Sequence, residues 1–428
     1  MTPPTPAPAR RAWTVVVLLV LFMAVNFLDK SVLGLAGKHI KDDLGLDDTR
    51  FGTIGSAFFL LFSLSGAAAG FAADRLTARR LVTAMAVVWS LAQLLVALPA
   101  AGLATLVATR VVLGAAEGPA FPLANHVAFS WFPDERRTLP GSLLTIGGAV
   151  GVAVGAPLLA LTITRAGWRA AFALTGVLGL LWLLAWLRWG GEGPHGVHAR
   201  PAEGGRVPYR RLLTRGTVLG GLAGGFAAFW LMAVALTWLP QFLQRVHGYE
   251  LERAGLVAAG TQVAGIVFIL GIGYASQRML RRGRSSRVAR GVLGGAAVVV
   301  SGAATLLLTR VGGGVALVAA MLVAFTVGNA FFGLMQAVLA EIAPLRQRAA
   351  LLCTVTAAAS TAGAFGPLAS GALVDAAGSA AAGFRHAFDL AAALMIVCGL
   401  LAAALIRPAR DRASLAEPPA AAVPQAAH

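Results

Sequence analysis

The sequence predicts an all-α membrane protein whose twelve transmembrane helices form two pseudo-symmetric six-helix bundles. The first observation is composition: 58% of the 428 residues are apolar and only 12% are charged, whereas a soluble chain carries about a quarter charged residues. The second is that apolar runs reach the roughly 20 residues needed to cross a hydrocarbon core. The third is an internal repeat that relates the two halves of the chain.

The apolar runs predict twelve spans, at residues 13–37, 51–73, 81–99, 102–131, 140–164, 169–189, 215–245, 254–280, 290–309, 314–342, 350–374 and 384–406. Six spans form an N-terminal bundle (13–189) and six a C-terminal bundle (215–406). A polar stretch at 190–214 predicts a linker without a core of its own. Residues 1–12 are expected to be a cytoplasmic tail, and the Ala- and Pro-rich residues 407–428 a disordered one.

The repeat consists of three sets of residues that recur at offsets of 203, 211 and 216 residues. In the first set, Gly45, Arg50, Gly52 and Gly70 are matched by Gly248, Arg253, Gly255 and Gly273. Small changes in offset fit changes of loop length after a duplication. Parallel repeats about an axis normal to the membrane predict a transporter with its substrate site between the halves.

The net charge of +17 would suggest a nucleic-acid partner if the basic residues were spread evenly. They are not, because 24 of the 35 Lys and Arg residues fall on the side of the N-terminus, the linker and the tail. This is the positive-inside bias of membrane proteins. It predicts both termini in the cytoplasm, a bacterial-type inner membrane as the location, the lipid bilayer as a partner and no nucleic acid. Nothing demands an oligomer, so a monomer is expected.

The loop after the second span is the first motif, and it runs Gly70-Phe-Ala-Ala-Asp74-Arg75-Leu-Thr-Ala-Arg79-Arg80. It resembles the signature loop of the major facilitator superfamily, G-x-x-x-D-R-x-G-x-R-R, with threonine where the second glycine is usual. A carboxylate at a helix end can hold arginines against neighbouring helix termini. We therefore expect a gating role for this loop; the alternative is a topology signal alone.

Four ionisable residues lie well inside predicted spans: Asp29 and Lys30 in the first, Arg110 and Glu117 in the fourth. Each costs roughly 2.5 kcal/mol or more at mid-membrane unless it is paired or hydrated, which makes each a candidate for function. Asp29 and Arg110 each lie eight residues from the outer end of their span, a depth of about 12 Å. The four side chains are therefore expected to share one cavity in the N-terminal half.

The chemistry of these residue types suggests their roles. Arginine and lysine can hold the carboxylate of a substrate, and arginine does so bidentately. A desolvated carboxylate favours its neutral form and can take up a proton in the working pH range. We therefore assign Lys30 and Arg110 to substrate binding, and Asp29 and Glu117 to proton coupling. The alternative is a pair of static salt bridges that only hold two helices together.

The sequence from Arg110 onward, RVVLGAAEGPAFPLAN, resembles the anion:cation symporter family of the same superfamily. That family includes transporters of sugar acids and other organic anions. The resemblance implies that the acidic and basic pair of the first helix, and the arginine and glutamate of the fourth, deal with substrate and protons. By motif match these positions are Asp29, Lys30, Arg110 and Glu117.

Three positions depart from the family pattern. Lys30 replaces the usual arginine, Phe27 stands where sugar-acid members often carry tyrosine, and Ser360 stands where they often carry asparagine. Two expected contacts to sugar hydroxyls are thus missing or shortened. An aromatic or short-chain carboxylate becomes more plausible than a heavily hydroxylated sugar acid.

The C-terminal half has no comparable buried charges. Its candidate substrate contacts are Trp238, Gln241 and Ser360. The resemblance implies a cavity position for Trp238, although its sequence context alone fits a lipid-facing or core position equally well. Asn329 lies on one helix face with Gln336, an arrangement that favours interhelical hydrogen bonding at least as much as ligand contact.

Taken together, these patterns predict a secondary active transporter that takes up a small organic anion with protons by alternating access. Single carboxylates beside cations favour protons over sodium. There is no phosphate-binding G-x-x-x-x-G-K-[ST] motif, no nucleophile constellation and no Cys/His metal cluster. We therefore expect neither an enzyme nor a resident cofactor or metal. The alternative that we keep is a proton-coupled drug or metabolite exporter of the same fold.

Overall fold

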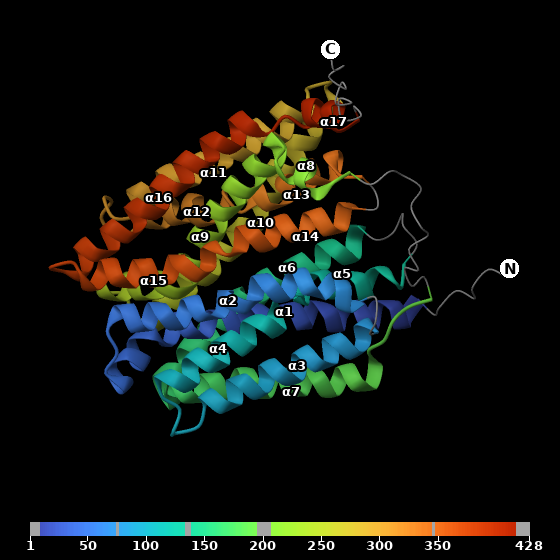
Figure 1. The fold of residues 1–428 in the computed structure, drawn as a ribbon. Helices are drawn as coiled ribbons and strands as arrows, with labels where there is room; N and C mark the ends of the chain where they lie inside the picture. Colours follow the sequence, from blue (N-terminus) through green and yellow to red (C-terminus); the bar gives the residue numbers. More distant parts are fainter. Residues whose placement is uncertain (1–8, 74–76, 133–137, 195–206, 345–346, 417–428) are drawn as a thin grey trace, which may run out of the picture.

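A computed structural model describes residues 9–73, 77–132, 138–194, 207–344 and 347–416, and these residues form helices joined by short connections (Figure 1). The N-terminal half contains α1 (Ala9–Leu44), α2 (Asp48–Ala73), α3 (Ala78–Val96), α4 (Leu103–Glu117), α5 (Ala120–Phe129), α6 (Thr138–Ala166) and α7 (Trp168–Trp189). Figure 1 shows this half, in blue to green, beside the C-terminal half in yellow-green to red.

The C-terminal half begins with a short helix and ends with one. Its elements are α8 (Tyr209–Leu213), α9 (Gly216–Arg245), α10 (Leu251–Arg281), a π-helical turn η2 (Arg287–Val292) that continues into α11 (Leu293–Leu307), α12 (Val315–Thr326), α13 (Ala330–Ile342), α14 (Arg348–Ser360), α15 (Ala362–Asp375), α16 (Ala380–Leu405) and α17 (Pro408–Ala416).

The twelve expected spans are present in this arrangement. In the described part of the chain, ten helical segments are long and apolar enough to cross a membrane. The other two expected spans are α2, of 26 residues, and the pair α4 and α5, which Pro119 divides. Proline has no N–H to donate to the helical ladder, so the fourth span breaks directly after Glu117. The all-α prediction and its twelve membrane helices are confirmed.

The prediction of a disordered tail from residue 407 is wrong for its first part. Pro408–Ala416 form α17, which packs at the end of the C-terminal half. Asp411 is buried and its Oδ2 accepts the backbone N–H of Thr217 at 2.7 Å, at the start of α9. Proline at the first helical position and an acidic residue in the first turn are helix-start signals. The prediction of disorder rested on the Ala- and Pro-rich composition and did not take these positions into account. Residues 417–428 lie outside the described part.

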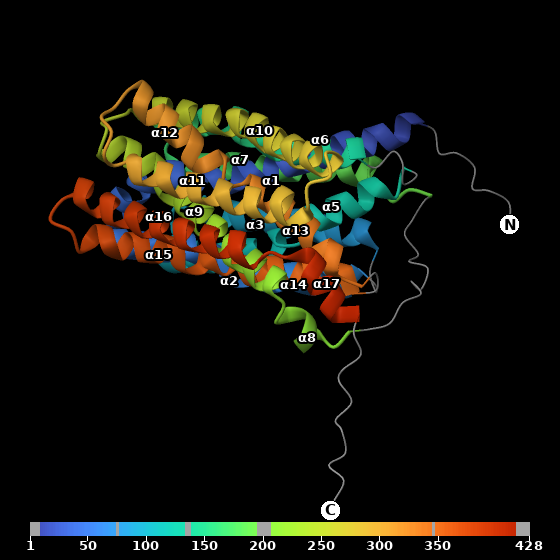
Figure 2. The ribbon, with the colours of Figure 1, turned by 90° about the horizontal axis from the view of Figure 1, so that it is seen from above.

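The two halves meet mainly at one end of the bundle. The start of α1 and α17 lie at the other end, which we call the terminal end; the α1–α2 and α15–α16 connections lie at what we call the closed end (Figures 1 and 2). Near the closed end α2 packs tightly on α15, since a Cβ added at Gly52 would lie 2.5 Å from the carbonyl oxygen of Pro367. Likewise, a Cβ at Gly34 of α1 would lie 2.0 Å from the carbonyl oxygen of Leu236 in α9. Glycine at both positions allows the halves to approach closely.

Candidate substrate and proton site

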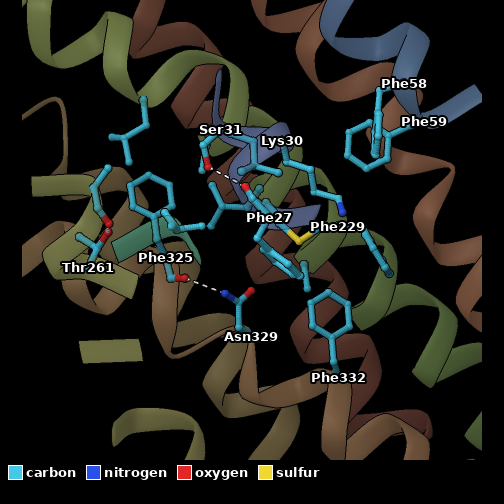
Figure 3. Close-up of a pocket in the computed structure, with 18 of the residues that line it drawn as sticks. Phe27, Lys30, Ser31, Phe58, Phe59, Phe229, Thr261, Phe325, Asn329 and Phe332 are labelled. Atoms are coloured by element: carbon cyan, nitrogen blue, oxygen red, sulfur yellow. Dashed lines mark hydrogen bonds between the residues drawn. The ribbon is translucent and has the colours of Figure 1, made fainter. Parts of the chain in front are cut away.

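A cavity of about 400 Å³ lies between the two halves, where side chains of both converge (Figure 3). Its polar wall in the N-terminal half consists of Asn26, Lys30, Ser31 and Glu117, and in the C-terminal half of Thr261, Ser301 and Asn329. Most of the remaining lining is aromatic or aliphatic, including Phe27, Phe58, Phe59, Phe62, Phe121, Phe229, Phe325 and Phe332. Apolar walls with a few convergent polar groups are typical of small-molecule sites.

The ion pair between α1 and α4 is the main polar feature of this cavity. Lys30 Nζ lies 2.6 Å from Glu117 Oε2, with the lysine side chain 12% exposed and the glutamate fully buried. Lys30 also donates to Asn26 Oδ1, one turn earlier in α1. The structure therefore brings together two of the four predicted charges and places both on the cavity wall.

Aromatic rings surround the lysine ammonium. Its Nζ lies 4.8 Å from the ring centroid of Phe27, 5.7 Å from that of Phe58 and 6.0 Å from that of Phe62. Ring faces attract a cation at such distances. The rings hold the ammonium at the cavity wall without supplying an anion, so Glu117 remains its charge partner.

The other two predicted charges lie behind this wall rather than on it. Asp29 and Arg110 are 0% and 3% exposed and do not line the cavity. Among the described residues, both oxygens of the Asp29 carboxylate and Nη2 of Arg110 lack a hydrogen bond of good geometry, although Thr175 and Gln93 lie beside the carboxylate. The Asp29 and Arg110 side chains also lie within electrostatic range of each other and of Glu117. The guanidinium carbon of Arg110 is 5.5 Å from the ring centroid of Phe172 in α7.

Helix geometry explains this division. Neighbouring residues in a helix point about 100° apart, so Asp29 and Lys30 cannot face the same cavity. Lys30 faces the other half, and Asp29 faces the interior of its own bundle. The expectation that all four charges share one cavity is therefore wrong; they form two adjoining layers.

Two glycines bring Glu117 to its partner. A Cβ added at Gly114 would lie 1.8 Å from the carbonyl oxygen of Phe58, and one at Gly118 would lie 2.3 Å from that of Phe62. Only glycine permits α4 to lie this close to α2. Because Glu117 stands between these glycines, the close packing fixes its carboxylate at the level of Lys30.

The three predicted contacts of the C-terminal half do not line this cavity. Trp238 is fully buried between Phe51 and Phe384, and its Nε1 donates to the carbonyl oxygen of Pro367 at 3.0 Å. Gln241 is fully buried near the closed end, and neither polar atom of its amide has a hydrogen-bond partner among the residues that the structure describes.

Ser360 is bonded to the other half, its Oγ lying 2.6 Å from Oγ of Ser63 in α2. In this conformation Trp238 and Ser360 both join the halves together. Their roles as substrate contacts stay predictions, which would require a conformation in which these contacts open.

The polar pair of the tenth span separates in the structure. Asn329 lines the cavity and donates from Nδ2 to the carbonyl oxygen of Phe325 at 2.9 Å, as Figure 3 shows, whereas Gln336 donates to Thr356 at 2.8 Å and does not line it.

Sequence reasoning missed the phenylalanines opposite Lys30. Phe229 and Phe332 lie with ring centroids 4.7 Å apart, and their apolar context gave no signal to separate them from core residues.

The predicted gating loop is described only in part. Gly70 lies in α2, whereas Asp74 and Arg75 lie outside the described residues. Arg79 and Arg80 begin α3 and are exposed. Nη2 of Arg79 donates to the carbonyl oxygen of Leu187 in α7 at 2.9 Å, so this arginine ties α3 to the end of α7. The gating role of the loop stays a prediction.

A polar network at the closed end was not foreseen. Asp48, the first residue of α2, is paired with Lys41 of α1 and accepts from Nη1 of Arg245 in α9 at 2.7 and 2.8 Å. Asp375, the last residue of α15, accepts the backbone N–H groups of Asp48 at 3.0 Å and Thr49 at 2.6 Å. It thus caps the start of α2 from the opposite half, and an anion at a helix N-terminus is stabilised there.

Two six-helix bundles around a central cavity that carries a buried ion pair form the architecture of a multi-pass membrane transporter. The model of the Major Facilitator Superfamily matches residues 19–332. The chain belongs to this superfamily; it is a membrane transporter and not an enzyme.

Several curated relatives are named as transporters of sugar acids. The hexuronate transporter of Bacillus subtilis is 27% identical over 407 residues, covering 92% of this chain and 94% of that protein. The D-galactonate transporter of Escherichia coli is 27% identical over 311 residues, covering 66% and 71%. Among solved structures, a bacterial homolog of the human lysosomal transporter Spinster, inward-facing and unoccupied, gives a TM-score of 0.77 at 18% identity, covering 95% of this chain and 99% of that one. This last likeness concerns the fold alone.

Proposed function

We propose that this transporter takes up a small organic anion together with a proton. The observation that carries the proposal is the ion pair of Lys30 and Glu117, 2.6 Å apart on the wall of the cavity between the halves. A static pair that only joined two helices would need no cavity beside it. The sugar-acid names of the relatives support an anion as the substrate.

The pair provides a simple coupling cycle. While Glu117 is ionised, it neutralises Lys30 and the cavity holds no free positive charge. A proton on Glu117 removes the negative partner and leaves the ammonium to bind the carboxylate of the substrate. Because a lone buried charge is costly, the protonated empty site and the deprotonated loaded site are both disfavoured. Proton and anion therefore bind together and leave together.

The lining favours a carboxylate with few hydroxyl groups. Phenylalanines face the ion pair, and the hydrogen-bonding side chains of the opposite wall are few: Thr261, Ser301 and Asn329. A sugar acid would leave several hydroxyl groups without partners in such a cavity, and each unpaired buried polar group costs about 1–3 kcal/mol. An aromatic or short-chain carboxylate avoids this cost, so we place it ahead of a sugar acid.

The charge distribution supports a membrane orientation. The terminal end carries most of the Lys and Arg residues, and by the positive-inside rule this supports a cytoplasmic location for that end in a bacterial-type inner membrane. Phe121, one turn beyond Glu117 toward that end, lines the cavity and is 43% exposed, whereas the closed end is joined by Asp48 and Asp375. We therefore propose that this conformation faces the cytoplasm.

The test is proton entry into proteoliposomes that contain a pH-sensitive dye, when a panel of aromatic, short-chain and sugar carboxylates and of lipophilic cations is added outside. Proton entry is measured because one proton and one monovalent carboxylate carry no net charge together. We expect proton entry with carboxylates. Arg110→Ala should abolish it, because the buried layer of Asp29 and Arg110 would lose its cation. Arg385→Ala, which removes an exposed arginine of α16, is the matched control and should keep the proton entry.

Proton entry with carboxylates at the wild-type rate in Arg110→Ala would remove Arg110 from the mechanism. The second candidate function, a proton-coupled exporter of drugs or metabolites, draws support from the same aromatic walls and the buried carboxylate of Glu117. No proton movement with any carboxylate, together with proton movement when lipophilic cations are added, would favour the exporter.

A further inference from the structure

A second cavity, of about 390 Å³, lies at the terminal end of the C-terminal half. It is formed where α8 leads into α9, where α16 ends and where α17 begins, and it is lined by Arg215, Arg407, Arg410 and Asp411 among others. These residues are far from the ion pair of the central cavity in the fold, and the transport cycle proposed above does not use them.

The charge of this second cavity is not balanced. Three arginines face one aspartate, whose Oδ2 already accepts the N–H of Thr217. Within the described part of the chain, none of the three arginines has a carboxylate partner within 4.0 Å. The cavity therefore offers uncompensated positive charge to an anion.

The hydrogen-bonding capacity of the arginines is also mostly unused. Arg215 donates from Nε to the carbonyl oxygen of Arg211 and from Nη1 to Ser414 Oγ, both at 2.9 Å, which fixes its position. Within the described residues, the guanidinium of Arg407 donates only from Nε, to the carbonyl oxygen of Ala404 at 3.1 Å. Arg410 is exposed and makes no hydrogen bond to the described residues. Guanidinium groups with free N–H groups are suited to the bidentate recognition of phosphate oxygens.

An apolar surface adjoins the basic cavity. Leu405 lines it and is 36% exposed, and Leu401, one turn earlier in α16, is 44% exposed. On the neighbouring α9, Leu219 is 45% exposed one turn after Arg215. The cavity thus lies where the lipid-facing surface of two membrane helices ends. A molecule that carries an anionic head and apolar tails matches both parts.

We propose that this cavity binds the phosphate of an anionic phospholipid headgroup, with the acyl chains along the exposed leucines of α9 and α16. Basic residues beside membrane helices attract anionic lipids. Because α17 supplies Arg410 and contacts α9 through Asp411, a bound lipid holds the start of α9, the end of α16 and α17 together. A free phosphate ion would satisfy the arginines but leave the leucines without a partner.

The experiment measures thermal unfolding of the full chain in detergent while phosphatidylglycerol, phosphatidylcholine or inorganic phosphate is added. The test variant is Arg407→Gln/Arg410→Gln, which leaves the structural Arg215 in place. The matched control is Arg281→Gln/Arg284→Gln, which removes two exposed arginines at the end of α10 and in its connection to η2, at the same end of the bundle. Arg410→Gln alone controls for misfolding of the double variant, since the Arg410 side chain makes no hydrogen bond with the described residues that the change would remove.

Phosphatidylglycerol should raise the unfolding temperature of the wild type and of the control at similar concentrations, and phosphatidylcholine should not. In the test variant, the lipid concentration that gives half of the maximal rise in unfolding temperature should increase about 25-fold. The reason is that each basic residue near an anionic lipid increases the affinity for it roughly fivefold. In Arg410→Gln this concentration should rise about fivefold. Equal responses of test and control variants would overturn the site, and full stabilisation by inorganic phosphate alone would overturn the lipid as its ligand.

Discussion

The two halves face each other both at the closed end and around the central cavity, and the side chains of these two regions differ in polarity. At the closed end, the halves meet through charged and polar groups: Asp48 with Arg245, and Asp375 with the start of α2. In the cavity, phenylalanines line the walls and one buried ion pair, Lys30 with Glu117, stays within a single half. Asp48 is only 7% exposed, but its partner Arg245 belongs to the opposite half, so this bond breaks when the halves separate at this end. The Lys30–Glu117 pair lies within one half, so it can persist through that movement and changes only when a proton or a substrate replaces one partner.

The largest effect should follow from breaking the cavity's ion pair. Glu117→Gln removes the group that takes up the proton, so we expect proton-driven accumulation to be lost while counterflow exchange of substrate persists. The measurement is uptake of labelled substrate in proteoliposomes, with and without a proton gradient. Glu341→Gln is the matched control: its carboxylate is bonded to Arg290 at 2.8 Å, away from the cavity, and it should accumulate substrate normally. Intact accumulation in Glu117→Gln would exclude this residue from coupling.

A smaller effect should follow from changing the aromatic wall. Phe332→Leu keeps the cavity apolar but removes one ring of the pair that Phe332 forms with Phe229 at 4.7 Å. Aromatic contacts contribute about 0.5–1.5 kcal/mol beyond burial, so the KM for a benzoate-like carboxylate should rise roughly two- to twelvefold. The KM for a short aliphatic carboxylate should change less. Phe365→Leu, at an exposed position of α15, is the control; an equal loss for both substrates would argue against aromatic recognition.

The sequence was informative where a signal is local. Apolar runs predicted the spans, and the cost of intramembrane charge singled out Lys30 and Glu117, which the structure pairs. The separation of Asp29 from Lys30 could have been foreseen, because adjacent helical positions diverge by about 100°.

The closed end could not have been foreseen in the same way. Asp375 lies 327 positions after Asp48, and each alone resembles a solvated residue at a span end. Their contact depends on how the two halves meet, which no local pattern records. The same holds for Trp238, whose indole N–H is bonded to Pro367. Its burial depends on how the two halves are arranged in this conformation, which the local sequence does not indicate.

The smallest effect should come from weakening the closed end. In Asp375→Asn one oxygen can still accept a hydrogen bond, but the negative charge at the start of α2 is lost. A charge at an exposed helix N-terminus contributes about 0.3–1 kcal/mol, so the balance between the closed and open states of this end should shift roughly two- to fivefold.

The shift can be measured as the labelling rate of a cysteine placed at Thr237, beside Gly55 in the contact between the halves, with Cys353 and Cys398 replaced by serine. Asp389→Asn removes the same charge from the C-terminal half, where Asp389 is bonded to Arg310 at 2.7 and 2.9 Å within that half. Labelling should accelerate in Asp375→Asn and not in Asp389→Asn. If labelling accelerated equally in both variants, the total negative charge at this end, and not the bond between the halves, would keep the end closed.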